Sequence, residues 1–124
     1  MADKQQRPRV LIVEDEMLVF MLVEDYLDQL GYDVVGPASS LEKALTIADE
    51  AEMDLAVLDV NLDGKQTFPV ADRLVARGVP FIFATGYGAG GVPPRFSSTP
   101  VLQKPFKCED LGAALREISA IRSA

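Results

Sequence analysis

The stretch Asp54-Leu55-Ala56-Val57-Leu58-Asp59, continued by Val60-Asn61-Leu62-Asp63-Gly64, decides the fold of this chain. Four apolar residues in a row, without alternation, are typical of a strand that is covered on both faces in a parallel sheet. The strand ends in the carboxylate of Asp59, and a polar loop that contains Gly64 follows. Ligands of open α/β sheets bind beyond the carboxyl ends of the strands, so Asp59 is the first candidate functional residue.

Similar apolar runs recur along the chain and alternate with helical patterns. Strands are predicted over residues 10–13, 33–36, 55–58, 80–84 and 100–102. Helices are predicted over 17–30, from a capping box formed by Ser39 and Glu42, from Pro69 to Gly78, and along an apolar stripe that begins at Leu111. This alternation requires a parallel sheet with helices on both faces.

The chain has the length of one domain, with 124 residues. Its first eight residues are polar and are predicted to form a mobile tail, which leaves residues 9–122 as the domain. The interval between Thr85 and Lys104 is rich in glycine and proline, which are poor helix formers. A helix in this interval is therefore predicted to be short, irregular or missing.

Composition excludes several classes of function. The formal net charge of −7 argues against direct binding of nucleic acid, which requires a basic face. The absence of histidine rules out histidine metal ligands and histidine-based catalysis. A single cysteine cannot form an internal disulfide, and no apolar run reaches membrane-spanning length. These features predict a cytoplasmic protein with no membrane partner.

Polar residues stand at four predicted strand ends, and these ends meet at one edge of the sheet. They are the pair Glu14-Asp15, then Asp59, Thr85 and Lys104. Three carboxylates and one ammonium leave two negative charges, which a divalent cation would balance, and an all-oxygen ligand set favours Mg²⁺. A carboxylate beside Mg²⁺, a lysine and a threonine hydroxyl is suited to accept a phosphoryl group, with Thr85 bonding to that group.

With these residues in place, the chain resembles a response-regulator receiver domain of bacterial two-component signalling over residues 9–121. The matching motifs are Val-Leu-Ile-Val-Glu14-Asp15-Glu, Leu-Asp59, Thr85 and Lys104-Pro105-Phe106. The resemblance implies a flavodoxin-like fold, a five-stranded parallel sheet of order 2-1-3-4-5, and phosphorylation of Asp59 by a histidine kinase.

Further site residues come from the resemblance alone. It implies that Asp15 and Asp59 bind Mg²⁺ directly, that Glu14 acts through water, and that Asn61 contributes its backbone carbonyl. It also implies a cis bond before Pro105 that directs Lys104 into the pocket.

Residues 80–87, Pro-Phe-Ile-Phe-Ala-Thr-Gly-Tyr, are similar to the motif of the FATGUY receivers, a subgroup usually associated with HWE/HisKA2 kinases. Many receivers carry a rotating aromatic residue where this chain has Val101. Tyr87 is therefore the predicted substitute, and it shares the switch role with Thr85. Signalling is expected to change the face formed by residues 85–101, and the downstream partner is unknown.

Other interpretations remain open at this point. Taken singly, Asp15 could cap a helix, and Asp59 or Asn61 could form turns. The whole chain could be a phosphate sink for a shared kinase or an interaction module that works without phosphorylation. A phosphatase with an aspartate nucleophile usually shows Asp-x-Asp after its first strand, whereas this chain has Asp59-Val-Asn61 after the third. An electron carrier of flavodoxin type would need a phosphate-binding loop after the first strand.

Overall fold

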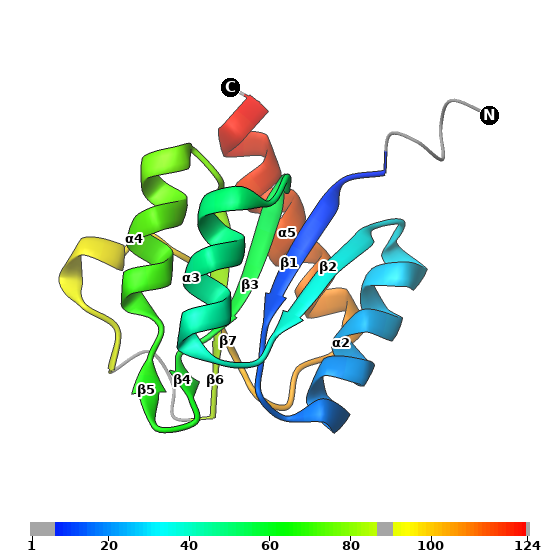
Figure 1. Ribbon diagram of the computed structural model, residues 1–124. Helices are drawn as coiled ribbons and strands as arrows, with labels where there is room; N and C mark the ends of the chain where they lie inside the picture. The colour runs from blue at the N-terminus through cyan, green and yellow to red at the C-terminus, as the bar shows by residue number, and fades with distance from the viewer. Residues whose placement is uncertain (1–6, 87–90, 124) are drawn as a thin grey trace.

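A five-stranded parallel sheet forms the centre of the computed structural model, which describes residues 7–86 and 91–123, the last four by backbone only (Figure 1). Its strands, in spatial order, are β2 (Asp33–Ala38), β1 (Arg9–Val13), β3 (Leu55–Asp59), β6 (Phe81–Thr85) and β7 (Val101–Gln103). Every neighbouring pair is parallel. The predicted strand order and fold class are therefore confirmed, with β4 and β5 lying outside this sheet.

Four α-helices cover the two faces of the sheet in the described residues. Helices α2 (Met17–Leu30) and α5 (Cys108–Ser123) lie on one face, and α3 (Leu41–Glu50) and α4 (Phe68–Arg77) lie on the other (Figure 1). Each face has its own apolar core, and β3 contributes to both because all five of its residues are buried. This two-sided burial explains why the sequence of β3 does not alternate.

The helix ends follow the sequence signals closely, with one exception. Gly31 (φ 91°) and Gly78 (φ 72°) end α2 and α4 in the left-handed conformation that glycine adopts easily. The capping box predicted at Ser39 is wrong by one residue. The N-cap of α3 is Ser40, whose hydroxyl accepts a hydrogen bond from the backbone N–H of Lys43 at 3.2 Å.

The polar loop predicted after β3 is a small antiparallel hairpin. It consists of β4 (Asn61–Leu62) and β5 (Lys65–Gln66), joined by a two-residue turn. Both turn residues have positive φ, 50° at Asp63 and 82° at Gly64, which is the geometry that an Asp-Gly pair favours in hairpins. The hairpin projects beyond the carboxyl end of β3 (Figure 1).

The connection from β6 to β7 contains no α-helix among its described residues, 86 and 91–100. These residues include a 3₁₀ turn, Pro94–Phe96, which agrees with the prediction that a helix in this interval is short, irregular or missing. Phe96 is 4% exposed and packs edge-on against Phe81 and Phe83, with ring centroids 5.9 and 5.4 Å away. It also stacks on Phe68 at 6.0 Å, so one side chain joins this connection to both β6 and α4.

The N-terminal residues were assigned to a mobile tail, of which residues 1–6 lie outside the described part. Arg7 donates hydrogen bonds to the carbonyls of Tyr32 (2.8 Å) and Gly31 (3.1 Å), and the carbonyl of Pro8 accepts one from Asp33. These two residues therefore contact the domain. The start of β1 and the end of α5 both lie on the side opposite the hairpin (Figure 1). Among the described residues, no helix combines the length and the apolar character needed to cross a membrane.

Candidate functional site

Three carboxylates converge at the carboxyl edge of the sheet. Glu14 and Asp15 follow β1, and Asp59 ends β3. One carboxylate oxygen from each residue lies within 4.8 Å of those of the other two. Glu14 and Asp59 are only 5% and 7% exposed, whereas Asp15 is open to solvent. Parallel pairing of β1 with β3 brings these residues together, as the alternation of strands and helices predicted.

Lys104 completes the cluster from the end of β7. Its Nζ donates to Glu14 Oε1 at 2.9 Å and to Asp59 Oδ2 at 3.1 Å, so it lies between two of the three carboxylates. The peptide bond from Lys104 to Pro105 is cis in the structure. A backbone hydrogen bond from Lys104 N–H to the Thr85 carbonyl (2.9 Å) fixes the end of β7 against β6.

Burial and charge act in opposite directions on the ionisable groups of this cluster. Burial raises the pKa of Glu14 above its ordinary value, against the lowering effect of the hydrogen bond from Lys104. Burial alone would lower the pKa of Lys104, but the hydrogen bond that Lys104 donates to Glu14 and the charge of Asp59 outweigh this effect, and the pKa is raised. Lys104 therefore stays cationic, while the carboxylates around it carry an excess of negative charge.

The carboxylate of Asp59 is held at both oxygens. Oδ2 accepts the hydrogen bond from Lys104, and Oδ1 accepts one from the backbone N–H of Asn61 at 3.2 Å. The hairpin also reaches the acidic pair, because the backbone N–H of Asp63 donates to Asp15 Oδ2 at 3.0 Å. Two of the acids are thus positioned partly by the backbone of the hairpin.

A cleft of about 470 Å³ opens over this cluster. Asp15, Asp59, Asn61 and Lys104 line it, together with Gly86, the residue after Thr85. The Thr85 side chain is 4% exposed at the end of β6. The predicted site residues thus gather at one edge, except Tyr87, which lies outside the described residues.

Thr67 is a residue of this region that the sequence did not single out as functional. It is fully buried at the start of α4, and its hydroxyl donates to the main-chain carbonyl of Asp59 at 2.6 Å. A threonine directly before a helix is typical of an N-cap, so the local sequence predicts a capping role for Thr67. It does not predict the hydrogen bond to Asp59, which lies eight residues earlier.

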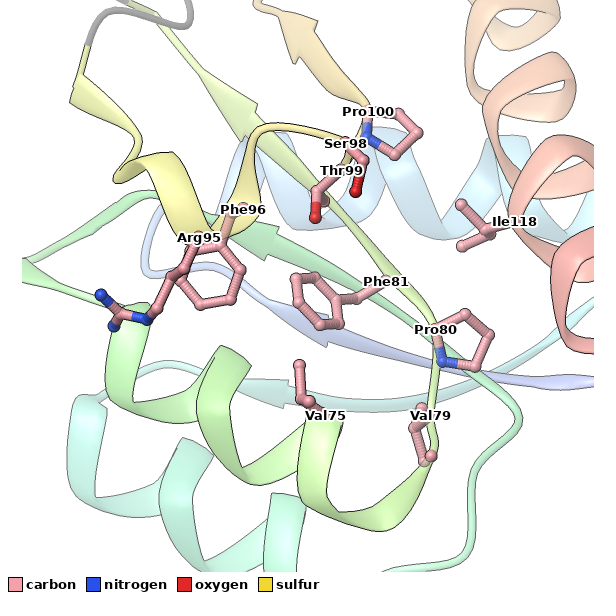
Figure 2. A pocket seen from close by; sticks show the side chains of 11 residues that line it. Val75, Val79, Pro80, Phe81, Arg95, Phe96, Ser98, Thr99, Pro100 and Ile118 are labelled. Atoms are coloured by element: carbon pink, nitrogen blue, oxygen red, sulfur yellow. The ribbon is translucent and has the colours of Figure 1, made fainter.

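A second cavity lies away from the acidic cluster, at the amino ends of β6 and β7 (Figure 2). Its volume is about 360 Å³, and its walls include Val79, Phe81, Phe96 and Ile118. Its lining includes none of the carboxylates of the acidic cluster, and the guanidinium of Arg95 points away from it in Figure 2. The polar cleft is therefore the better candidate for chemistry.

The chain is thus a doubly wound α/β domain whose carboxyl edge holds clustered acids and a lysine, a site that can bind a divalent cation. The chain matches the family model of the response regulator receiver domain over residues 10–116. It therefore belongs to the receiver domain family, and the resemblance seen in its motifs is confirmed at that level.

Two curated relatives illustrate the match. The chain is 37% identical over 115 residues to the positive alginate biosynthesis regulatory protein of Pseudomonas aeruginosa, covering 89% of this chain and 46% of that protein. It is 29% identical over 131 residues to the transcriptional regulatory protein PdtaR of Mycobacterium tuberculosis, covering 97% and 64%. The chain thus spans about half to two thirds of the length of these relatives.

A solved structure matches over nearly the whole length of both chains. SdrG from Sphingomonas melonis Fr1 is 39% identical, with a TM-score of 0.78, and the match covers 95% of this chain and 98% of that one. The receiver domain of PhyR from Erythrobacter litoralis is 26% identical, with a TM-score of 0.82, covering 97% and 95%.

Proposed function

We propose that this receiver domain accepts a phosphoryl group from a histidine kinase on Asp59, in a reaction that requires Mg²⁺. The observation that carries the proposal is the position of Lys104 Nζ, which lies 2.9 Å from Glu14 and 3.1 Å from Asp59 beside a third carboxylate, Asp15. An arrangement built only for stability would gain little from three acids around one lysine, because like charges repel and their burial is costly.

The donor set fits Mg²⁺. Its three clustered carboxylates offer oxygen, the ligand that hard divalent cations prefer, and the cluster keeps negative charge after Lys104 is counted. Asp15 and Asp59 would bind the ion directly, Glu14 would act through water, and Asn61 would add its backbone carbonyl. Once bound, the ion would neutralise charge on the oxygens of the phosphoryl group.

The chain's own residues account for the rest of the transfer. A carboxylate oxygen of Asp59 attacks phosphorus, and the bond from phosphorus to the donor breaks with its electron pair leaving on the donor. Lys104 stabilises negative charge on the phosphoryl oxygens, and Thr85 donates a hydrogen bond to the attached group. The same groups permit slow self-dephosphorylation, so the chain acts as a switch.

One relative supports the chemistry. A second solution structure of SdrG shows its BeF₃-activated conformation, and it is 43% identical with a TM-score of 0.76, covering 90% of this chain. BeF₃⁻ becomes tetrahedral when an oxygen coordinates it, and it then resembles an attached phosphoryl group in shape and charge. Acceptance of such a group by a relative of nearly the same length favours Asp59 as the acceptor here.

The signal would leave through residues 85–101. Phosphorylation adds about one to one and a half negative charges beside Thr85, by analogy with other phosphorylated side chains. This charge would favour one of two arrangements of the β6–β7 connection, with Tyr87 as the aromatic switch. Output would pass to a downstream protein, or the domain would draw phosphate from a shared kinase.

Several finer assignments belong to the same proposal. Residues 9–122 would work as a receiver of the FATGUY subgroup in the cytoplasm, with an HWE/HisKA2 kinase as donor. Helix α2 exposes Met17, Leu18, Met21 and Leu22 near the acidic edge, which offers the kinase an apolar docking face.

The test is phosphorylation of Asp59→Asn. The wild-type chain should take up label from a phosphorylated kinase or from acetyl phosphate only when Mg²⁺ is present, and the variant should take up none. Asp63→Asn is the matched control, since Asp63 lies in the same cleft but is not a proposed ligand. Persistent labelling of Asp59→Asn would end the acceptor assignment. Metal-independent binding of a partner with no labelling would favour the interaction module, and turnover of a free phosphomonoester would favour a phosphatase.

A further inference from the structure

The side chain of Thr67 forms an unusual hydrogen bond for a residue at the start of a helix. Threonine at an N-cap normally accepts a hydrogen bond from the second or third residue of the helix. Thr67 makes no such side-chain cap bond with α4. Its hydroxyl instead donates to the carbonyl of Asp59 at 2.6 Å, and it lies 3.4 Å from the carbonyl of Val60.

The sequence of α4 explains why the hydroxyl is released from capping. The second residue of the helix is Pro69, which has no N–H to offer. The third is Val70, whose N–H already bonds to the main-chain carbonyl of Thr67 at 2.9 Å. The hydroxyl can therefore bond to β3 without depriving the second or third helix residue of a hydrogen-bond partner.

This bond closes the base of the hairpin that carries Asn61. The backbone N–H of Thr67 donates to the carbonyl of Val60 at 3.0 Å, and Val60 in turn donates to Ala84 on β6 at 3.0 Å. Asp59 is then fixed at three points: its carbonyl by Thr67, Oδ1 by Asn61 N–H and Oδ2 by Lys104. Because Thr67 is fully buried, water does not compete for this contact.

We propose that Thr67 is a positioning residue for phosphoryl transfer. Its hydroxyl holds the main chain of Asp59 and the base of the hairpin so that the carboxylate faces the incoming phosphorus in line with the leaving group. This inference rests on the proposed function. In-line attack depends steeply on position, and a displacement of about 1 Å costs on the order of 100-fold in rate.

The experiment compares Thr67→Val, which keeps the shape and removes the hydroxyl, with Thr67→Ser, which keeps the hydroxyl. Labelling by acetyl phosphate is followed by intact-protein mass spectrometry at saturating Mg²⁺ and saturating donor. Thr67→Val should label roughly 10-fold to 100-fold more slowly than wild type, and Thr67→Ser should stay within about threefold. Saturating Mg²⁺ ensures that the difference reflects the transfer step rather than metal affinity.

A stability control separates positioning from general damage. Leu74→Val shortens a fully buried side chain in the C-terminal half of α4 that does not line the acidic cleft, so it should label like wild type even where its melting temperature falls. Equal rates for Thr67→Val and Leu74→Val, or failure of Thr67→Ser to restore the rate, would overturn the inference. If wild type itself took up no label, the proposed function would fail, and this inference with it. Normal wild-type labelling with an unaffected Thr67→Val would overturn this inference alone.

Discussion

Two connections lead away from the neighbouring central strands, and they are built differently. Residues 60–67, after β3, form a hairpin whose backbone bonds to Asp59, to Asp15 and to itself. The described part of 86–100, after β6, contains a 3₁₀ turn with short-range backbone bonds of its own, and one backbone bond joins it to β6, from Phe83 N–H to the Pro100 carbonyl at 3.0 Å. Its further attachments are made by side chains: buried Phe96, partly buried Val92, and the exposed ion pair of Arg95 with Asp72.

The difference shows how one domain can be both precise and responsive. Backbone hydrogen bonds hold the first connection in a single geometry, as a site for in-line transfer requires. The second connection is held mainly by side chains, and side-chain packing can be rearranged with fewer broken backbone bonds, as a switching element requires. We therefore expect substitutions in and around the hairpin to change Mg²⁺ binding and phosphoryl transfer. Substitutions in the second connection should mainly change how well that connection itself is ordered.

The largest effect is expected from Phe96→Ala. This change removes a ring that contacts three other phenylalanines and should lower the free energy of unfolding by about 3–5 kcal/mol, measured by urea denaturation. Hydrogen exchange should accelerate mainly in residues 91–99. Equal acceleration in residues 60–67 would contradict the separation of the two connections.

Binding of Mg²⁺ tests the hairpin side. At ten times its dissociation constant the ion should raise the free energy of unfolding by about 1.4 kcal/mol, seen as a higher melting temperature. Asp15→Asn should remove this effect. Asp72→Asn, which changes a carboxylate beside the second connection, should keep it.

The pH dependence of the free energy of unfolding tests the raised pKa of Glu14. Its raised pKa means that the folded state holds the proton more tightly than the unfolded state, so Glu14 lowers stability as pH rises from about 4.5 through its folded pKa. In Mg²⁺-free buffer, wild type should lose stability relative to Glu14→Gln across this window. A constant difference between the two proteins from pH 4 to pH 8 would show that Glu14 is not perturbed.

The smallest effect is expected from the ion pair of the second connection. Arg95 and Asp72 are both about half exposed and form a two-point contact at 3.1 and 3.0 Å. A double-mutant cycle with Arg95→Gln and Asp72→Asn should give a coupling of roughly 0.2–1 kcal/mol. A coupling several times larger would mean that the ion pair, rather than Phe96, is the main anchor.

Most of the fold could be predicted because short stretches of the sequence carry clear signals for strands and for helix ends. Unbroken apolar runs marked β1, β3 and β6, glycines marked the ends of α2 and α4, and the alternation predicted a parallel sheet. The order of its strands came from the resemblance to receiver domains. The hairpin was missed although Asp63-Gly64 is a strong turn signal, because strands of two residues carry almost no periodicity. Ser39 and Ser40 are adjacent candidates for one cap, and only the backbone geometry decides between them.

The candidate site was predictable to a similar degree. Glu14, Asp15, Asp59 and Lys104 come together because each lies at the carboxyl end of a strand or directly after it, and parallel strands end at one edge. Thr67 could not be found this way, since its partner lies eight residues back and its position suggested a cap. A contact that depends on the path of a loop produces no regular spacing of residues from which it could be predicted.

The placement of the first and last elements has a practical consequence. The start of β1 and the end of α5 lie on the side away from the hairpin (Figure 1), and Arg7 is tied there to the end of α2. A fluorophore, affinity handle or sensor surface attached beyond either of these elements would leave the acidic cleft facing outward. Kinase encounters could then be timed on immobilised protein without obstructing the surface being measured.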